Sequence, residues 1–101
     1  MTELCFRVVR AAREGYGGPP VLRDRLFCDV DLPRYYRRMR ALSQEPRTSA
    51  TVASFYAVYD QSAEYLMTIG VWTLLERGDL APGDRTQLEG VRDFTMWTAT
   101  R

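Results

Sequence analysis

Residues 49–77 of the chain read SATVASFYAVYDQSAEYLMTIGVWTLLER, and this stretch decides the fold that the sequence predicts. It contains no proline and one interior glycine, Gly70, which predicts a single helix far longer than the average of roughly 11–12 residues. Thr48 or Ser49 is expected to cap its start, and Gly78 its end. Such a helix would be roughly 43 Å long, whereas a compact domain of this size has a radius of gyration of only about 13 Å. One chain can hardly cover a rod of that length.

Two apolar lines run along the predicted helix. The broader line is expected to form the core and consists of Val52, Phe55, Tyr56, Tyr59, Ala63, Leu66, Gly70, Thr73 and Leu74. The narrower line consists of Val58, Tyr65, Ile69 and Trp72. Because a helix that is apolar on all sides must be covered on all sides, the narrower line predicts the interface of a homodimer or of a partner protein. A bend of the helix at Gly70 is the alternative.

Residues 4–12 and 21–31 flank the breaker GYGGPP at positions 15–20, and apolar and polar side chains alternate in both runs. Two alternating runs around a Gly/Pro loop predict a β-hairpin, with two short helices as the alternative. The predicted fold is therefore a single, helix-dominated α+β domain over residues 1–101. It consists of an N-terminal hairpin followed by three helices, of which the central one is long. An all-α bundle is the alternative fold.

Residues 32–44 form the most clearly amphipathic segment, with Asp31 as the expected cap and Pro33 in the first turn. One side of this helix is apolar and carries Leu32, Tyr35, Tyr36, Met39 and Leu42, and the other side carries Arg34, Arg37, Arg38 and Arg40. Arginine binds carboxylates and phosphates bidentately, so this arginine face is the candidate surface for an acidic protein partner or for nucleic acid.

A solvated arginine face paired with acids of the C-terminal half is the alternative. Residues 1–47 carry ten arginines and six acids, whereas residues 48–101 carry four arginines and seven acids. The two halves are therefore expected to attract each other, within one molecule or across a dimer.

Residues 84–97 predict the last helix. Asp84 and Gln87 form a variant of the capping box at its start, and its inner face consists of Leu88, Val91, Phe94, Thr95 and Thr98. The stretch LLERGDLAPGDR, residues 74–85, resembles the turn after the first helix of GntR-type winged-helix regulators. Members of that family continue with a recognition helix and a wing, whereas one predicted helix follows here. The resemblance therefore assigns no DNA-reading residue to this chain.

The composition limits the chemistry that the chain can perform. All 14 basic residues are arginine and histidine is absent, which excludes histidine bases, Ser-His-Asp and Cys-His nucleophile systems and mixed Cys/His zinc sites. Cys5 and Cys28 are too few for a structural zinc site and are expected to be buried, reduced thiols, with a mutual disulfide as the alternative. Asp60 and Glu64, one turn apart, are expected on a solvated polar face. We therefore predict no catalytic residue, no metal site and no cofactor.

These observations predict a non-enzymatic protein-interaction module, a small adaptor or inhibitor that docks on a larger assembly. The exclusive use of arginine is typical of a GC-rich genome, bacterial or phage. The chain has no apolar run long enough to span a membrane, and its first residues are not expected to form a signal peptide, so the predicted location is the cytoplasm. The alternative function is a nucleic-acid-binding regulator that uses Arg34, Arg37, Arg38 and Arg40.

Overall fold

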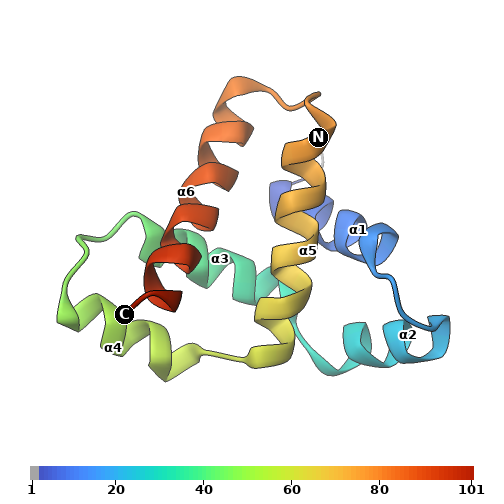
Figure 1. Cartoon of the computed structure of the whole chain (residues 1–101), viewed down its shortest axis with the longest axis horizontal. Helices are drawn as coiled ribbons and strands as arrows, with labels where there is room; N and C mark the ends of the chain where they lie inside the picture. Colours follow the sequence, from blue (N-terminus) through green and yellow to red (C-terminus); the bar gives the residue numbers. More distant parts are fainter. Residues whose placement is uncertain (1–2) are drawn as a thin grey trace.

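The computed structural model describes residues 3–101, and every regular element in that range is an α-helix (Figure 1). The helices, in chain order, are α1 (Leu4–Gly15), α2 (Pro20–Asp29), α3 (Leu32–Ser43), α4 (Ser49–Val58), α5 (Gln61–Arg77) and α6 (Pro82–Ala99). α5 packs against α1, α3 and α6, while α2 and α4 lie at the periphery. In the described range no helix combines the length and the hydropathy needed to cross a membrane.

The predicted β-hairpin is wrong, because its two strands are the helices α1 and α2. α1 buries Leu4, Val8 and Ala12, which follow one another at intervals of one helical turn. Phe6 supported the strand-like alternation, but its side chain is 48% exposed. α2 begins with Pro20 in the first helical turn and buries none of its residues. The all-α alternative is therefore confirmed.

The predicted long helix is also wrong. Two residues in extended conformations, Tyr59 (φ −64°, ψ 134°) and Asp60 (φ −136°, ψ 115°), divide it into α4 and α5. The Asp60 side chain accepts a hydrogen bond from the backbone N–H of Ala63 at 3.0 Å and so caps α5. Gly70, where a bend was the alternative, lies inside α5. Because neither α4 nor α5 approaches the length of the predicted rod, helix length no longer favours a homodimer.

The outer ends of α4 and α5 agree with the sequence prediction. Thr48 caps α4 by accepting a hydrogen bond from the backbone N–H of Thr51 at 3.4 Å. Gly78 follows α5 with φ +73°, the left-handed conformation that favours glycine. The predicted cap of α3 is confirmed too, since Asp31 accepts a hydrogen bond from the backbone N–H of Arg34 at 3.2 Å. Local capping chemistry therefore fixed these boundaries.

α6 begins earlier than predicted, at Pro82. The preceding residue, Ala81, provides no side-chain cap, so the capping box predicted for Asp84 and Gln87 is wrong. The predicted inner face is buried at Leu88, Val91, Phe94 and Thr98 and half-buried at Thr95. Helical periodicity thus located the face of α6 correctly while its start was missed.

The core lies between α1, α3, α5 and α6. Its largest fully buried side chains include Tyr36, Phe94, Leu32, Met39, Leu66, Met67, Leu74 and Leu88. In α5, Gly70 lies so close to α1 that a Cβ atom there would be 2.3 Å from the backbone oxygen of Val8. The missing side chain at Gly70 therefore allows α1 and α5 to pack backbone to backbone.

The two thiols lie in different environments. Cys5 is buried, Cys28 is exposed and both are free, so the predicted burial holds for Cys5 alone. Cys5 Sγ donates a hydrogen bond to Glu3 Oε2 at 2.7 Å. Burial, together with this hydrogen bond, raises the pKa of Cys5 to about 11. The Cys5 thiol therefore stays protonated at neutral pH.

We expect Cys28 to react with a disulfide reagent in the native protein at about pH 8, and Cys5 to react only after unfolding, because the thiolate is the reactive form. Thiol titration of the native and of the urea-unfolded protein measures both rates. Cys28→Ser is the control and should remove the native-state reaction. Two thiols that react at the same rate in the native chain would contradict the burial of Cys5.

Candidate binding surfaces

The four arginines of the predicted face lie in two different environments. Arg34 and Arg38 are exposed and form no ion pair with any residue in the range 3–101. Arg37 donates a hydrogen bond to Glu3 at 2.8 Å, and Arg40 lines a cleft beside α6. Within the described residues, none of the four arginines pairs with an acid of the C-terminal half. The alternative prediction, an arginine face paired with those acids, is therefore not observed in this range.

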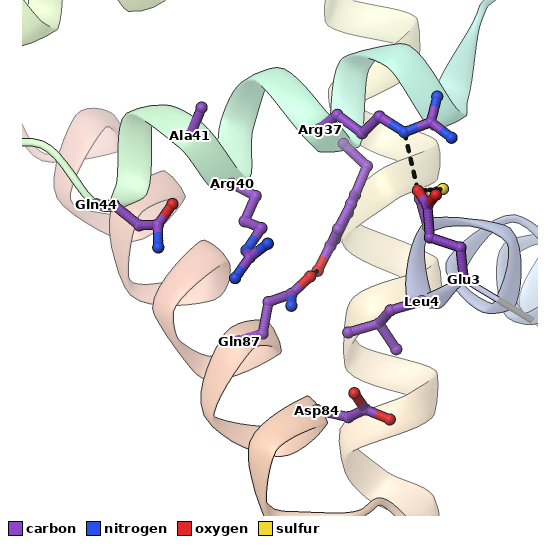
Figure 2. A pocket seen from close by; sticks show the side chains of 10 residues that line it. Glu3, Leu4, Arg37, Arg40, Ala41, Gln44, Asp84 and Gln87 are labelled. Carbon is purple, nitrogen blue, oxygen red and sulfur yellow. Dashed lines mark hydrogen bonds and ion pairs between the residues drawn. The ribbon is translucent and has the colours of Figure 1, made fainter. Parts of the chain in front are cut away.

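α1, α3 and α6 surround a cleft of about 470 Å³ (Figure 2). Its floor includes Cys5 and Tyr36, which are both buried. Arg37 and Arg40 line it from α3, and Gln87 lines it from α6. Two of the four predicted arginines are therefore brought together at a concave site, and the other two are not.

Most charged groups around the cleft are paired. The hydrogen bond from Arg37 is the main cause that holds the pKa of Glu3 below its ordinary value. Arg7 of α1 lies 3.6 Å from Asp84 of α6. Arg40 has no carboxylate partner within residues 3–101. The cleft therefore carries one positive charge that no neighbouring acid offsets.

The buried groups of the cleft are hydrogen-bond donors and acceptors rather than nucleophiles. The pKa of Cys5 is raised, so its thiolate is scarce at neutral pH. Burial also raises the pKa of Tyr36, whose hydroxyl donates a hydrogen bond to Gln87 Oε1 at 2.7 Å. The Cys5 thiol and the Tyr36 hydroxyl are therefore neutral, hydrogen-bonded groups, and the charge that the cleft offers to a ligand is that of Arg40.

Only part of the predicted interface line, Val58, Tyr65, Ile69 and Trp72, is exposed on one helix. Tyr65 and Trp72 lie two turns apart on α5 and are 54% and 41% exposed. The guanidinium of Arg92 on α6 lies 5.4 Å from the centroid of the Trp72 ring. Ile69 is half-buried and faces the end of α1, and half-buried Val58 belongs to α4 because the helix is broken. Tyr65 and Trp72 thus remain as the exposed part of the line.

Further exposed apolar side chains lie near the ends of α4 and α6. Tyr56 is 59% exposed, Tyr59 43% and Met96 54%. The sequence pattern had placed Tyr56 and Tyr59 in the core, and they lie outside it because the chain turns at Asp60. Aspartate is unfavourable inside a helix and is a favoured N-cap. Asp60 was therefore the signal in the sequence from which the break in the helix, and with it the exposure of Tyr56 and Tyr59, could have been predicted.

Thr95 on α6 borders two clefts that are lined by the exposed aromatic side chains. It lines a narrow cleft together with Trp72, and a second cleft of about 210 Å³ together with Tyr56 and Tyr59. Trp72 therefore lies at the seam between α5 and α6, and Tyr56 and Tyr59 lie where α4 meets the end of α6 (Figure 1). We define the apolar surface as Tyr56, Tyr59, Tyr65, Trp72 and Met96.

Glu64 borders the 210 Å³ cleft and is not the solvated residue that the sequence predicted. Its carboxylate accepts a hydrogen bond from the Tyr35 hydroxyl at 2.8 Å. Burial raises the pKa of Glu64, and burial is also the main cause of the raised pKa of Tyr35. Asp60, the other acid of the predicted pair, caps α5. The two acids therefore do not share one site.

We expect Glu64→Gln to gain unfolding free energy relative to wild type as the pH rises from about 4 to about 7. The folded-state pKa of Glu64 lies above its unfolded value. The protonated carboxyl therefore contributes stability below the unfolded pKa, and this contribution is lost as the pH rises through the folded pKa. Urea unfolding at both pH values measures the difference. Glu76→Gln, an exposed acid of α5, controls for the loss of one negative charge. A difference that is constant or shrinks toward neutral pH would contradict the burial of Glu64.

No protein-family model, curated protein or solved structure matches the chain. In the part of the chain that the structure describes, no three side chains of the ligand-forming types gather where they could hold a metal ion. A function is therefore inferred from the chemistry of the apolar surface and of the cleft.

Proposed function

We propose that the protein is a non-enzymatic protein-interaction module, a small adaptor or inhibitor that docks on a larger protein through its apolar surface. The observation that carries this proposal is the exposure of the five side chains, which ranges from 41% for Trp72 to 59% for Tyr56. Tyrosine, tryptophan and methionine are enriched at the centres of protein interfaces, and tyrosine and tryptophan often contribute most of the binding energy there.

Three side chains of the apolar surface, Tyr56, Tyr59 and Trp72, are held in place before any partner binds. The guanidinium of Arg92 covers one face of Trp72. The rings of Tyr56 and Tyr59 pack on buried Phe55, at centroid distances of 5.1 and 5.3 Å. Side chains that are already ordered lose less conformational entropy on binding. This order supports a docking role for the surface.

Site-specific photo-cross-linking in an extract of the source cells tests the proposal. A photoreactive amino acid at position 65 or 96 should trap one defined protein. The same amino acid in place of Val21, which is 82% exposed on α2, is the control and should trap none. An adduct from position 21 alone, or equal adducts from all three positions, would contradict docking through the apolar surface.

A second copy of the chain is one form that the trapped partner can take, and light scattering identifies it. A homodimer would have twice the 11.7 kDa mass of one chain, and Trp72→Ala should return it to the monomer. A mass of 11.7 kDa at every working concentration would exclude the homodimer and leave a different protein as the partner.

Nucleic-acid binding through α3 is the second candidate function, and it is favoured because Arg34 and Arg38 form no ion pair within residues 3–101. If α3 contacts phosphates, the affinity for a DNA duplex or single strand should fall steeply as salt is raised. Changing Arg34 and Arg38 together to alanine should reduce both the affinity and its salt dependence. Fluorescence anisotropy measures both quantities. No binding at low salt would exclude this function.

A further inference from the structure

We propose that the cleft between α1, α3 and α6 binds a small organic anion, and that Arg40, Gln44 and Gln87 hold its carboxylate or phosphate group. None of these residues belongs to the apolar surface, so this site is independent of the proposed docking function. The acid group lies between α3 and α6, and the apolar part of the ligand lies on the floor of the cleft.

Hydrogen-bond donors converge on this place from two helices. The Tyr36 hydroxyl donates to Gln87 Oε1 at 2.7 Å, which leaves the amide nitrogen of Gln87 without a partner in residues 3–101. The Gln44 amide and the Arg40 guanidinium line the same cleft and have no hydrogen-bond partner in that range either. Figure 2 shows Arg40 and Gln87 extending toward each other from α3 and α6. The cleft thus presents three donor groups that lack acceptors.

The charges around the cleft favour an anion at these donors. Glu3 and Asp84 line the cleft, but each already faces an arginine, Arg37 at 2.8 Å and Arg7 at 3.6 Å. Arg40 is the charge without such a partner. A carboxylate or phosphate that accepts from Arg40 forms charge-assisted hydrogen bonds, which are roughly twice as strong as neutral ones.

The shape of the cleft admits a ligand larger than the acid group alone. Its volume of about 470 Å³ lies within the range of roughly 300–1,000 Å³ that is common for small-molecule sites. Leu4 and the ring of Tyr36 supply an apolar floor. A second hollow of about 240 Å³ shares the three donor residues and continues past Gly83 and Gly90, which have no side chains to fill it. An organic acid or phosphate ester therefore suits the site better than an inorganic anion.

NMR titration of isotope-labelled protein tests the site through the side-chain signals of Arg40, Gln44 and Gln87. Phenyl phosphate and benzoate are the probes, benzyl alcohol is the neutral analogue, and inorganic phosphate is the anion without an apolar part. We expect saturable shifts with phenyl phosphate or benzoate, and an affinity about tenfold or more lower for benzyl alcohol and for inorganic phosphate. The tighter of the two organic probes identifies phosphate or carboxylate as the preferred group.

Variants at two of the three donors, Arg40 and Gln87, separate binding from folding. Arg40→Gln should weaken binding about tenfold or more. Gln87→Glu keeps an acceptor for Tyr36, replaces the donor by a negative charge and should abolish binding. Arg34→Gln, on the same helix but outside the cleft, should bind like wild type. The proposal is overturned by unchanged binding in Arg40→Gln, by equal binding of benzyl alcohol, by no saturable shift below about 10 mM, or by binding of oligonucleotides without binding of either organic anion.

Discussion

Gly70→Ala is expected to lower the unfolding free energy of the domain by about 1–3 kcal/mol, even though alanine is the better helix former. A Cβ atom at Gly70 would lie 2.3 Å from the backbone oxygen of Val8 and 2.9 Å from its Cγ1. Since backbone atoms cannot yield as a flexible side chain does, α1 must move away from α5. Packing along the most extensive helix contact of the domain is then lost. Urea unfolding followed by circular dichroism measures the change.

Gly90→Ala is the matched control, because Gly90 also lies inside a helix but, beyond its own helix backbone, no atom lies within 4 Å of the added Cβ. We expect this variant to be more stable than wild type by about 0.5–1 kcal/mol, the usual gain when alanine replaces glycine in a helix. A Gly70→Ala protein as stable as wild type would show that α1 and α5 do not approach each other as described.

Phe94→Ala is expected to destabilise the domain by about 3–5 kcal/mol, the usual cost of removing a large aromatic side chain from a core. Phe94 is fully buried, and its ring centroid lies 5.8 Å from that of Phe55 and 6.0 Å from that of Trp97. The guanidinium of Arg47 lies over the same ring at 5.0 Å. Phe94 therefore joins α6 to α4 and to the loop before α4. Thermal and urea unfolding measure the loss.

Met96→Ala, on the same helix, is the control for Phe94→Ala. Met96 is 54% exposed, so we expect its replacement to change the unfolding free energy by no more than about 0.5 kcal/mol. Equal losses for the two variants would contradict the orientation of α6, because Met96 would then be a core residue rather than part of the apolar surface.

Local signals in the sequence were enough to predict several helix ends and one helix face. Asp31, Thr48 and Gly78 are residues whose own side chain or backbone freedom ends or starts a helix, and they act without help from distant parts of the chain. The apolar period of residues 32–44 located the buried side of α3, because a helix with one apolar side can be buried in only one orientation.

The hairpin and the long helix were wrong because competing local patterns were nearly balanced. Leu4 and Val8 fit both a strand and a helix, and packing of α1 against α5 decided between the two. α2 buries no side chain, so its sequence carries little periodic signal. Asp60 lies one helical turn before Glu64, so the sequence pattern predicted that both residues belong to the polar face of one helix. In the structure Asp60 is instead the N-cap of α5.

The candidate sites depended more strongly on tertiary structure. The exposure of Arg34, Arg37, Arg38 and Arg40 was predictable from α3 alone. Which of these arginines line the cleft could not be predicted, because this depends on where Glu3 of the N-terminal segment and Gln87 of α6 lie. The hydrogen bond between Tyr36 and Gln87 joins residues 51 positions apart, and helical periodicity carries no information on such a contact.

The affinity for the cross-linked partner, compared between surface variants, tests the docking role of the apolar surface most directly. Tyr65→Ala and Trp72→Ala should each weaken binding about tenfold or more, because exposed aromatic residues at the centre of an interface contribute most of its energy. Both variants should keep the helical spectrum and a cooperative unfolding transition. Arg34→Ala together with Arg38→Ala should bind like wild type. Unchanged affinity in the two aromatic variants, with a loss in the arginine variant, would contradict docking through the apolar surface.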